Sequence, residues 1–196
     1  MKAKQVHPPA QSKRRLILPL LLAFIFIMSI FGFVIGSLNP DTSLDLGIDR
    51  GGYIFTPVAD GRWNVVVNDM TLSLATSPDD LIFSELDVSF GSLNVAQKVY
   101  VTREPNEAVV ASNELYSLLR SSRTTFPTCL KDGPGCEQLP LKTCSDARDR
   151  VVVIQLLLDD QRDFEVEGAC YTLRGDETSL IRMVDTFVLG SYGVSL

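Results

Sequence analysis

Four cysteines are the residues of this chain whose type and spacing could do chemistry, and their pattern favours structural disulfides. They lie at Cys129, Cys136, Cys144 and Cys170, with the spacing C-x6-C-x7-C-x25-C. That spacing contains neither the C-x-x-C pair of thiol oxidoreductases nor the short knuckles typical of four-cysteine zinc sites. Three pairings are possible, and we favour Cys129–Cys136, around a Gly-Pro-Gly turn, together with Cys144–Cys170. We therefore expect neither a metal nor a cofactor at the cysteines.

Other catalytic arrangements are mostly excluded by what the chain lacks. The only histidine, His7, lies in the N-terminal tail, so no Ser-His-Asp, Cys-His or histidine-based zinc site is expected elsewhere. The sequence also has no P-loop and no G-x-G-x-x-G motif. A Ser-Lys dyad or paired carboxylates would have to come from Lys98, Lys131, Lys142, Asp79, Asp80, Asp159, Asp160, Asp163, Glu165 and Glu167. Because the Asp-Asp pairs fall at predicted turns, where Asp binds nearby backbone, we assign no catalytic residue.

An apolar segment near the N-terminus predicts a membrane anchor. Residues 16–38 contain no charge, and as a helix they would extend roughly 34 Å, enough to cross a hydrocarbon core of about 30 Å. Five Lys and Arg residues precede the segment, and three Asp residues follow it within a short distance. The positive-inside rule therefore predicts a cytoplasmic N-terminus and an extracytoplasmic C-terminal domain.

Two details of this segment bear on its role. It is longer than the apolar region of a cleavable signal peptide, about 7–15 residues, so we favour a retained anchor. Cleavage near Gly36 and Ser37 is the alternative, and it would also export the domain. Gly32 and Gly36 have the small-xxx-small spacing of helix pairs that pack in membranes, so they are candidate helix-packing residues.

The charge balance restricts the partners of the exported part. Beyond residue 38 the chain has thirteen Lys and Arg against twenty-four Asp and Glu, a net charge of −11. Phosphate contacts need clustered cations, so we expect no nucleic-acid binding. The expected partners are the membrane itself, through the anchor, and another membrane or cell-surface protein.

Apolar periodicity predicts an α+β domain. The predicted organisation is a basic tail (1–15), a transmembrane helix (16–38), a linker (39–50) and an extracytoplasmic domain (51–196). Within the domain we expect a three-stranded meander over 52–76, strands over 98–102, 124–128, 151–158 and 164–173, and helices over 105–121 and from Asp176 to Gly190. This order, β-β-β-β-α-β-β-β-α, also allows a thioredoxin-like C-terminal half in which a cysteine-bearing loop (129–149) replaces a helix. We expect Asp185 at the edge of the last helix's apolar stripe.

Several phrases of the sequence form a running pattern over about residues 50–193. They include YIFTPVADGRWNVVVNDMTLSLATSPDDL, KVYVTREP, LPLKTCSDARDRVVVI, EGACYTLRG and DTFVLGSYGV. With the N-terminal anchor, this pattern resembles a family of uncharacterised single-pass membrane proteins from archaea with small genomes. The resemblance implies an anchored outer domain with Cys144 and Cys170 at matching positions, whereas Cys129 and Cys136 are outside the pattern. It implies no activity or substrate.

These observations lead to two hypotheses for function. The first is a membrane-anchored protein displaying a disulfide-containing domain that acts as a binding, adhesion or accessory-subunit module. The alternative is an extracytoplasmic enzyme, either a degenerate thioredoxin-like thiol oxidoreductase or a carboxylate-based hydrolase. The lack of an assembled catalytic set in the sequence favours the first hypothesis.

Overall fold

The computed structural model describes residues 19, 21–28, 47–83 and 88–195. The chain consists of two compact units, Met1–Asp45 and Leu46–Leu196. In the first unit, residues 21–28 are helical. Within the described ranges, no helix is both long and apolar enough to span a membrane. Most of the predicted anchor, including Gly32 and Gly36, lies outside the described residues.

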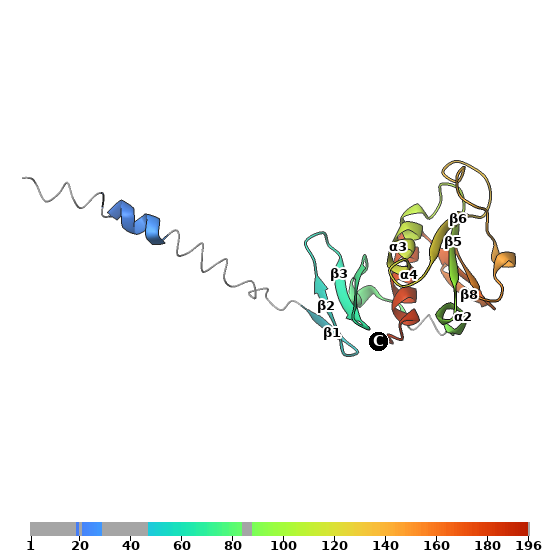
Figure 1. The fold of residues 1–196 in the computed structure, drawn as a ribbon, viewed down its shortest axis with the longest axis horizontal. Helices are drawn as coiled ribbons and strands as arrows, with labels where there is room; N and C mark the ends of the chain where they lie inside the picture. The colour runs from blue at the N-terminus through green and yellow to red at the C-terminus, as the bar shows by residue number, and fades with distance from the viewer. Residues whose placement is uncertain (1–18, 20, 29–46, 84–87, 196) are drawn as a thin grey trace, which may run out of the picture. The chain divides into compact units, whose positions relative to one another are not determined.

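The second unit begins with a four-stranded antiparallel sheet, β1 to β4, which is the predicted meander with one more strand and is called the meander below (Figure 1). Its strands follow chain order: β1 (Ile48–Arg50), β2 (Tyr53–Pro57), β3 (Trp63–Val67) and β4 (Met70–Leu74). Alternation places Phe55, Val65, Val67, Leu72 and Leu74 on one buried face, as the sequence predicts for β3 and β4. The β3–β4 hairpin turns at two residues in left-handed conformation, Asn68 and Asp69 (φ 50° and 63°). The sequence analysis missed β1, a short strand within the predicted linker 39–50.

A mixed five-stranded sheet forms the larger part of the unit. Its strands are β5 (Lys98–Arg103), β6 (Thr125–Cys129), β7 (Val151–Leu158), β8 (Asp163–Glu167) and β9 (Cys170–Gly175), in the order β6-β5-β7-β9-β8. The pairings are parallel except for the edge strand β8, which runs antiparallel to β9. The prediction of one strand over 164–173 was wrong, because Gly168 (φ 60°) turns the chain into a hairpin. The α+β class is confirmed, with two strands more than predicted.

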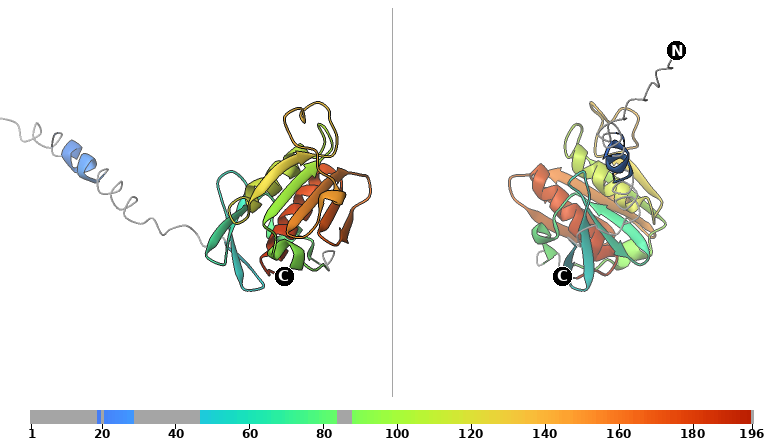
Figure 2. Two further views of the ribbon diagram at one scale, coloured as in Figure 1. Left: turned by 45° about the vertical axis from the view of Figure 1, so that its right-hand side comes forward. Right: turned by 90° about the vertical axis from the view of Figure 1, so that its left-hand side faces the viewer.

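Two long helices lie between the sheets (Figures 1 and 2). They are α3 (Val109–Leu119) and α4 (Glu177–Ser191), and they pack against each other and against the five-stranded sheet. Phe187 of α4 meets Tyr171 of β9 edge to face, with ring centroids 5.3 Å apart. The meander's buried face joins the same apolar core. Shorter helices connect the sheets, η1 (Pro78–Asp80) and α2 (Gly91–Asn94).

The start of α3 and the end of α4 differ from those predicted from the sequence. Helix α3 begins at Val109, four residues after Pro105, because Asn106 and Ala108 adopt left-handed conformations (φ 58° and 47°). In α4, Gly190 lies inside the helix; an added Cβ there would be 2.9 Å from the Phe90 ring. Close packing, not helix termination, explains this glycine. The predicted N-cap of α4, Asp176, is confirmed.

The face of the five-stranded sheet opposite the helices is covered by the connection from β6 to β7. Right-handed crossovers explain this placement: α3 connects β5 to β6 across one face, so the return past β5 to β7 crosses the other. This connection contains η3 (Cys144–Asp146), which packs on β7. The Cys144–Cys170 disulfide fixes η3 to the first residue of β9, with Cα atoms 5.3 Å apart.

Candidate functional site at the carboxyl edge of the five-stranded sheet

The carboxyl ends of four parallel strands meet at one edge of the five-stranded sheet. The chain leaves β5 at Arg103, β6 at Cys129, β7 at Leu158 and β9 at Gly175. In open sheets with parallel strands, ligands commonly bind at this edge, because the loops that follow the strands converge there. Two features occupy it: a cysteine loop after β6 and an acidic hollow after β7 and β9.

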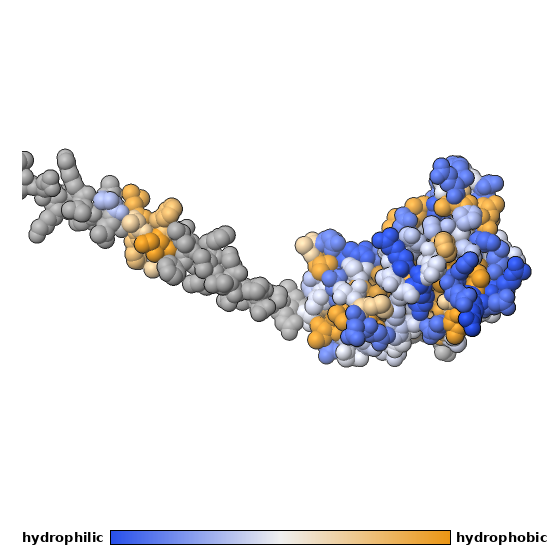
Figure 3. All heavy atoms as spheres, viewed as in Figure 1, coloured by the Kyte–Doolittle hydropathy of each residue, from blue (hydrophilic) through white to orange (hydrophobic). Residues whose placement is uncertain are grey.

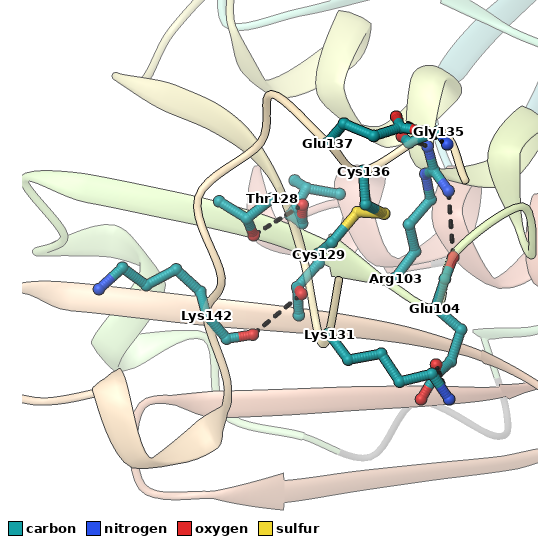
Figure 4. The surroundings of a disulfide bond; sticks show 11 residues. Arg103, Glu104, Thr128, Cys129, Lys131, Gly135, Cys136, Glu137 and Lys142 are labelled. Atoms are coloured by element: carbon teal, nitrogen blue, oxygen red, sulfur yellow. Dashed lines mark hydrogen bonds and ion pairs between the residues drawn. A yellow bond between two sulfur atoms is a disulfide. The ribbon is translucent and has the colours of Figure 1, made fainter. Parts of the chain in front are cut away.

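The cysteine loop (residues 129–140) is held against the end of β5 (Figure 4). The disulfide Cys129–Cys136 closes it, and the Arg103 guanidinium donates a hydrogen bond to the Gly135 carbonyl at 3.1 Å. Both cysteine residues are 0% exposed. Thiol–disulfide exchange requires a thiolate to reach a sulfur atom, so this disulfide is inaccessible in the folded chain. It acts as a staple at this edge.

Two contacts fix the tip of the cysteine loop. Lys131 Nζ lies 2.7 Å from Glu104 Oε2, and this partner raises the pKa of the exposed lysine. The backbone of Gly133 passes so close to Pro105 that an added Cβ would be 2.8 Å from the ring carbons. Only glycine allows this approach without a shift of the loop or of the segment that follows β5.

The acidic hollow has a volume of about 510 Å³ and is lined by Leu158, Asp159, Asp160, Asp176 and Glu177. Three of its carboxylates accept hydrogen bonds from backbone N–H groups of the chain. Asp176 accepts from the Ser179 N–H (2.9 Å), and Asp159 accepts from the Gln161 N–H (3.0 Å). Glu177, the first residue of α4, reaches across to cap α3.

Glu177 links the N-termini of the two long helices. Its Oε1 accepts from the backbone N–H groups of Val110 and Ala111, both at 3.1 Å. These amides belong to the first turn of α3, which lacks a side-chain cap of its own. A carboxylate at a helix N-terminus is favoured by the helix dipole. One wall of the hollow is therefore rigid and negatively charged.

The electrostatics of Asp176 suit a cation in the hollow and do not suit general acid catalysis by this residue. Hydrogen bonds from the Ser179 backbone and hydroxyl lower the pKa of Asp176, so this carboxylate stays charged at neutral pH. A general acid working near neutral pH needs a carboxyl with a raised pKa. Among the described residues, the carboxyl whose pKa is raised is Asp185, which is 0% exposed and lies about 14 Å further along the chain direction of α4 than Asp176.

Asp185 belongs to a polar cluster between the meander and the helices, which sequence analysis did not foresee. Its Oδ2 accepts from the Thr76 N–H at 2.7 Å, and its Oδ1 has no hydrogen-bond partner among the described residues. Burial raises its pKa to about 7; the negative charge of Glu114 adds to this, and Thr76 and Arg62 oppose it. The expectation that Asp185 lies at the edge of an apolar stripe was wrong, since a second sheet covers that side of α4.

Arg62 and Glu114 complete this cluster. The guanidinium makes two bonds to the Glu114 carboxylate, 3.0 Å from Nη1 to Oε2 and 2.5 Å from Nη2 to Oε1. It also donates to the hydroxyl and the carbonyl of Ser73 in β4. Arg62 thus connects the meander to α3 through Glu114 and satisfies the Ser73 carbonyl of β4.

The structure disperses most of the other candidate residues named from the sequence. Lys131 and Lys142 form ion pairs with Glu104 and Asp146, and Asp79 pairs with Arg50. Lys98 lines a second hollow, of about 430 Å³, at the amino ends of β5 and β7. Asp163, Glu165 and Glu167 are exposed along the edge strand β8.

Only Asp159 and Asp160 of the predicted acids are brought to the acidic hollow. Asp176 and Glu177 join them because β7 and β9 run parallel and end at the same edge. The signal in the sequence was an acidic pair directly after each of two largely buried strands, β7 and β9. Across the described residues, no group of three or more Asp, Glu, His or Cys side chains could hold a metal ion.

Comparisons of the chain with protein-family models, with curated proteins and with solved structures find no match.

Proposed function

We propose that this chain is a membrane-anchored binding module whose outer domain recognises a cationic segment of another membrane or cell-surface protein. The acidic hollow carries the proposal. It combines four carboxylates with the partly exposed side chain of Leu158, a pattern suited to the ammonium or guanidinium group and the aliphatic stem of a lysine or arginine.

Export of the domain is supported by the two disulfides and by the N-terminal sequence. Disulfides persist in oxidising compartments and are rare in reducing ones. The uncharged segment 16–38 and the cations before it carry the inference of a retained anchor with a cytoplasmic N-terminus. The strongly acidic balance of the exported part is a further reason to expect a basic partner.

The enzymatic alternatives receive less support. A thioredoxin-like oxidoreductase needs a reachable sulfur next to a second one in a C-x-x-C pair. Cys129, Cys136 and Cys170 are buried, and Cys144 is partly exposed but is bonded to Cys170, 26 residues away. A carboxylate-based hydrolase needs one protonated and one ionised carboxyl in a cleft, and the lowered pKa of Asp176 fits only the ionised one.

The test compares two charge-neutralising variants of the intact chain. Each variant is crosslinked to its partners on cells, extracted in mild detergent and isolated together with the proteins bound to it. Asp159→Asn with Asp160→Asn removes two charges from the hollow, and Glu165→Gln with Glu167→Gln removes two from the exposed edge strand β8. Each lost ion pair is worth about 0.2–1 kcal/mol, so the hollow variant should bind its partner roughly two- to thirtyfold more weakly. The β8 variant should bind like the wild type.

Two results would refute the proposal. One is equal capture by both variants, which would separate binding from the hollow. The other is a chain that alkaline carbonate releases from membranes, because a retained anchor resists such extraction.

A further inference from the structure

The outer face of the meander is unusual for a solvent-exposed sheet. The fifteen residues of β2, β3 and β4 include no charged residue. Ile54 and Val66 project from its two central strands and are 59% and 61% exposed. Figure 3 shows apolar patches among polar atoms over this part of the molecule. The remaining positions of this face are polar, as is usual for an exposed sheet, so the adjacent aliphatic pair at its centre is the feature that makes it a candidate contact surface.

The pairing register defines the arrangement of this face. Asp49 pairs with Ile54, and Val66 pairs with Thr71. Because Phe55 pairs with Val65, Ile54 and Val66 are also opposite each other. The face therefore carries a row across all four strands with an acid at one end, two aliphatic side chains in the middle and a hydroxyl at the other end. A second row pairs Thr56 with Asn64 and Asn64 with Ser73.

We propose that two copies of this chain pack together through the outer face of the meander. This inference rests on the proposed membrane anchor, which would hold both copies in one orientation. Consider a two-fold axis lying between the sheets and parallel to their strands. It sets Ile54 on Val66 of the second copy, Asp49 on Thr71, and Thr56 on Asn64, so the rows are self-complementary.

Charge favours a second copy over other occupants of this face. The exported part carries a net charge of −11, so two copies repel each other over most of their surfaces. Strands β2, β3 and β4 contribute no charge to this face, and Arg62, which bonds the Ser73 hydroxyl at its border, is paired with Glu114. In the two-fold arrangement the acid Asp49 of β1 meets a hydroxyl and not another acid. An anionic membrane surface would instead attract a basic face.

The size of the face explains why the anchor matters. Three strands about 17 Å long and the shorter β1, about 10 Å long, lie about 4.8 Å apart and give an area of roughly 300 Å² per copy. Stable complexes in solution bury about 800 Å² per partner. Confinement to a membrane raises the effective concentration, so a face too small for a stable dimer in solution is sufficient for one between anchored copies.

The test counts photobleaching steps of the full chain, labelled once at its N-terminus and reconstituted sparsely into phosphatidylcholine vesicles. The wild type should show two-step traces in excess of random co-reconstitution. Val66→Asp buries two unpaired carboxylates per dimer and should weaken association at least roughly tenfold. Ile54→Lys provides a second variant of the face. Val95→Asp is the matched control, because Val95 is 63% exposed and lies outside the meander.

Three outcomes would overturn the dimer. They are single-step traces from embedded wild type, equal dimer fractions for Val66→Asp and Val95→Asp, and dimers lost only on Gly32→Ile with Gly36→Ile, which would assign the contact to the membrane segment. Vesicle flotation separates the two proposals. A chain that does not float with the vesicles refutes the anchor and the dimer together, whereas a floating monomer refutes the dimer alone.

Discussion

Asp185 makes the stability of the outer domain depend on pH in a direction opposite to that of most carboxylates. Asp185→Asn is the informative perturbation, because asparagine has the shape of the protonated acid and cannot ionise. Its carbonyl oxygen can still accept the Thr76 N–H that now lies 2.7 Å from Oδ2. Any change that this substitution makes to the pH profile therefore reports the ionisation of Asp185.

The expected change in the free energy of unfolding follows from the raised pKa of Asp185. Burial shifts the pKa from 3.8 to about 7 in the folded chain, whereas the unfolded chain keeps the ordinary value. The folded state thus binds the proton more tightly, and stability from this group is complete below pH about 4 and is lost as the pH rises to about 7. At 1.36 kcal/mol per pKa unit, the loss is about 4 kcal/mol.

Unfolding by urea at a series of pH values from 4 to 8 tests this reasoning, using the intact chain in detergent. The chain's single tryptophan, Trp63 in β3, adjoins Arg62 and reports on the layer that contains Asp185. The free energy of unfolding of Asp185→Asn, relative to the wild type, should rise by about 4 kcal/mol across this range. The exposed, non-ionisable substitution Val95→Ala should leave the profile unchanged.

Parallel profiles for the wild type and Asp185→Asn would refute a raised pKa. A difference of the opposite sign would mean that Arg62 holds Asp185 ionised despite the competing Glu114. Parallel profiles would make the buried cluster insensitive to pH over this range, whereas the opposite sign would make it a contact that loses stability as the pH falls.

Two further predictions concern the staples. Replacing Cys144 and Cys170 by serine should lower the free energy of unfolding by about 3–4 kcal/mol, and the same change at Cys129 and Cys136 should lower it by about 2 kcal/mol. The difference arises because the first disulfide closes a loop of 26 residues and the second a loop of 7. Urea midpoints in the reverse order would contradict this prediction. Gly133→Ala should displace the cysteine loop and speed reduction of its disulfide by dithiothreitol, since the new methyl group would be 2.8 Å from Pro105. Gly91→Ala, with its nearest neighbour at 3.4 Å, is the control, and equal reduction rates in both variants would count against the tight approach.

Several strands, a helix N-cap and the disulfide pairing could be predicted from the sequence. Alternation identified β3 and β4, the nearly continuous apolar run 151–158 identified the central strand β7, and Asp176 was recognised as an N-cap. The pairing favoured from cysteine spacing is the pairing present in the structure. These features depend on residues close together in the chain, so composition and spacing suffice to predict them.

Other boundaries were missed because distant residues determine them. The sequence places the start of one helix at Pro105, but α3 begins at Val109, where Glu177 from another element caps its amides. Gly190 looks like a helix stop, but it accommodates the Phe90 ring from a segment a hundred residues earlier. In each case a residue with a clear local meaning serves a contact that periodicity cannot reveal.

By itself, the sequence determined an uncharged N-terminal segment and an acidic remainder with four cysteines, and its apolar periodicity indicated the α+β class. The tertiary structure decided where the acids lie. It inserted β9 between β7 and β8, which brings Asp159 and Glu177 to one hollow, and it laid the meander over α4, which buries Asp185. The physical reason is that a helical stripe or a strand pattern reports one buried face, whereas burial from a second side and convergence at a sheet edge depend on how whole elements pack.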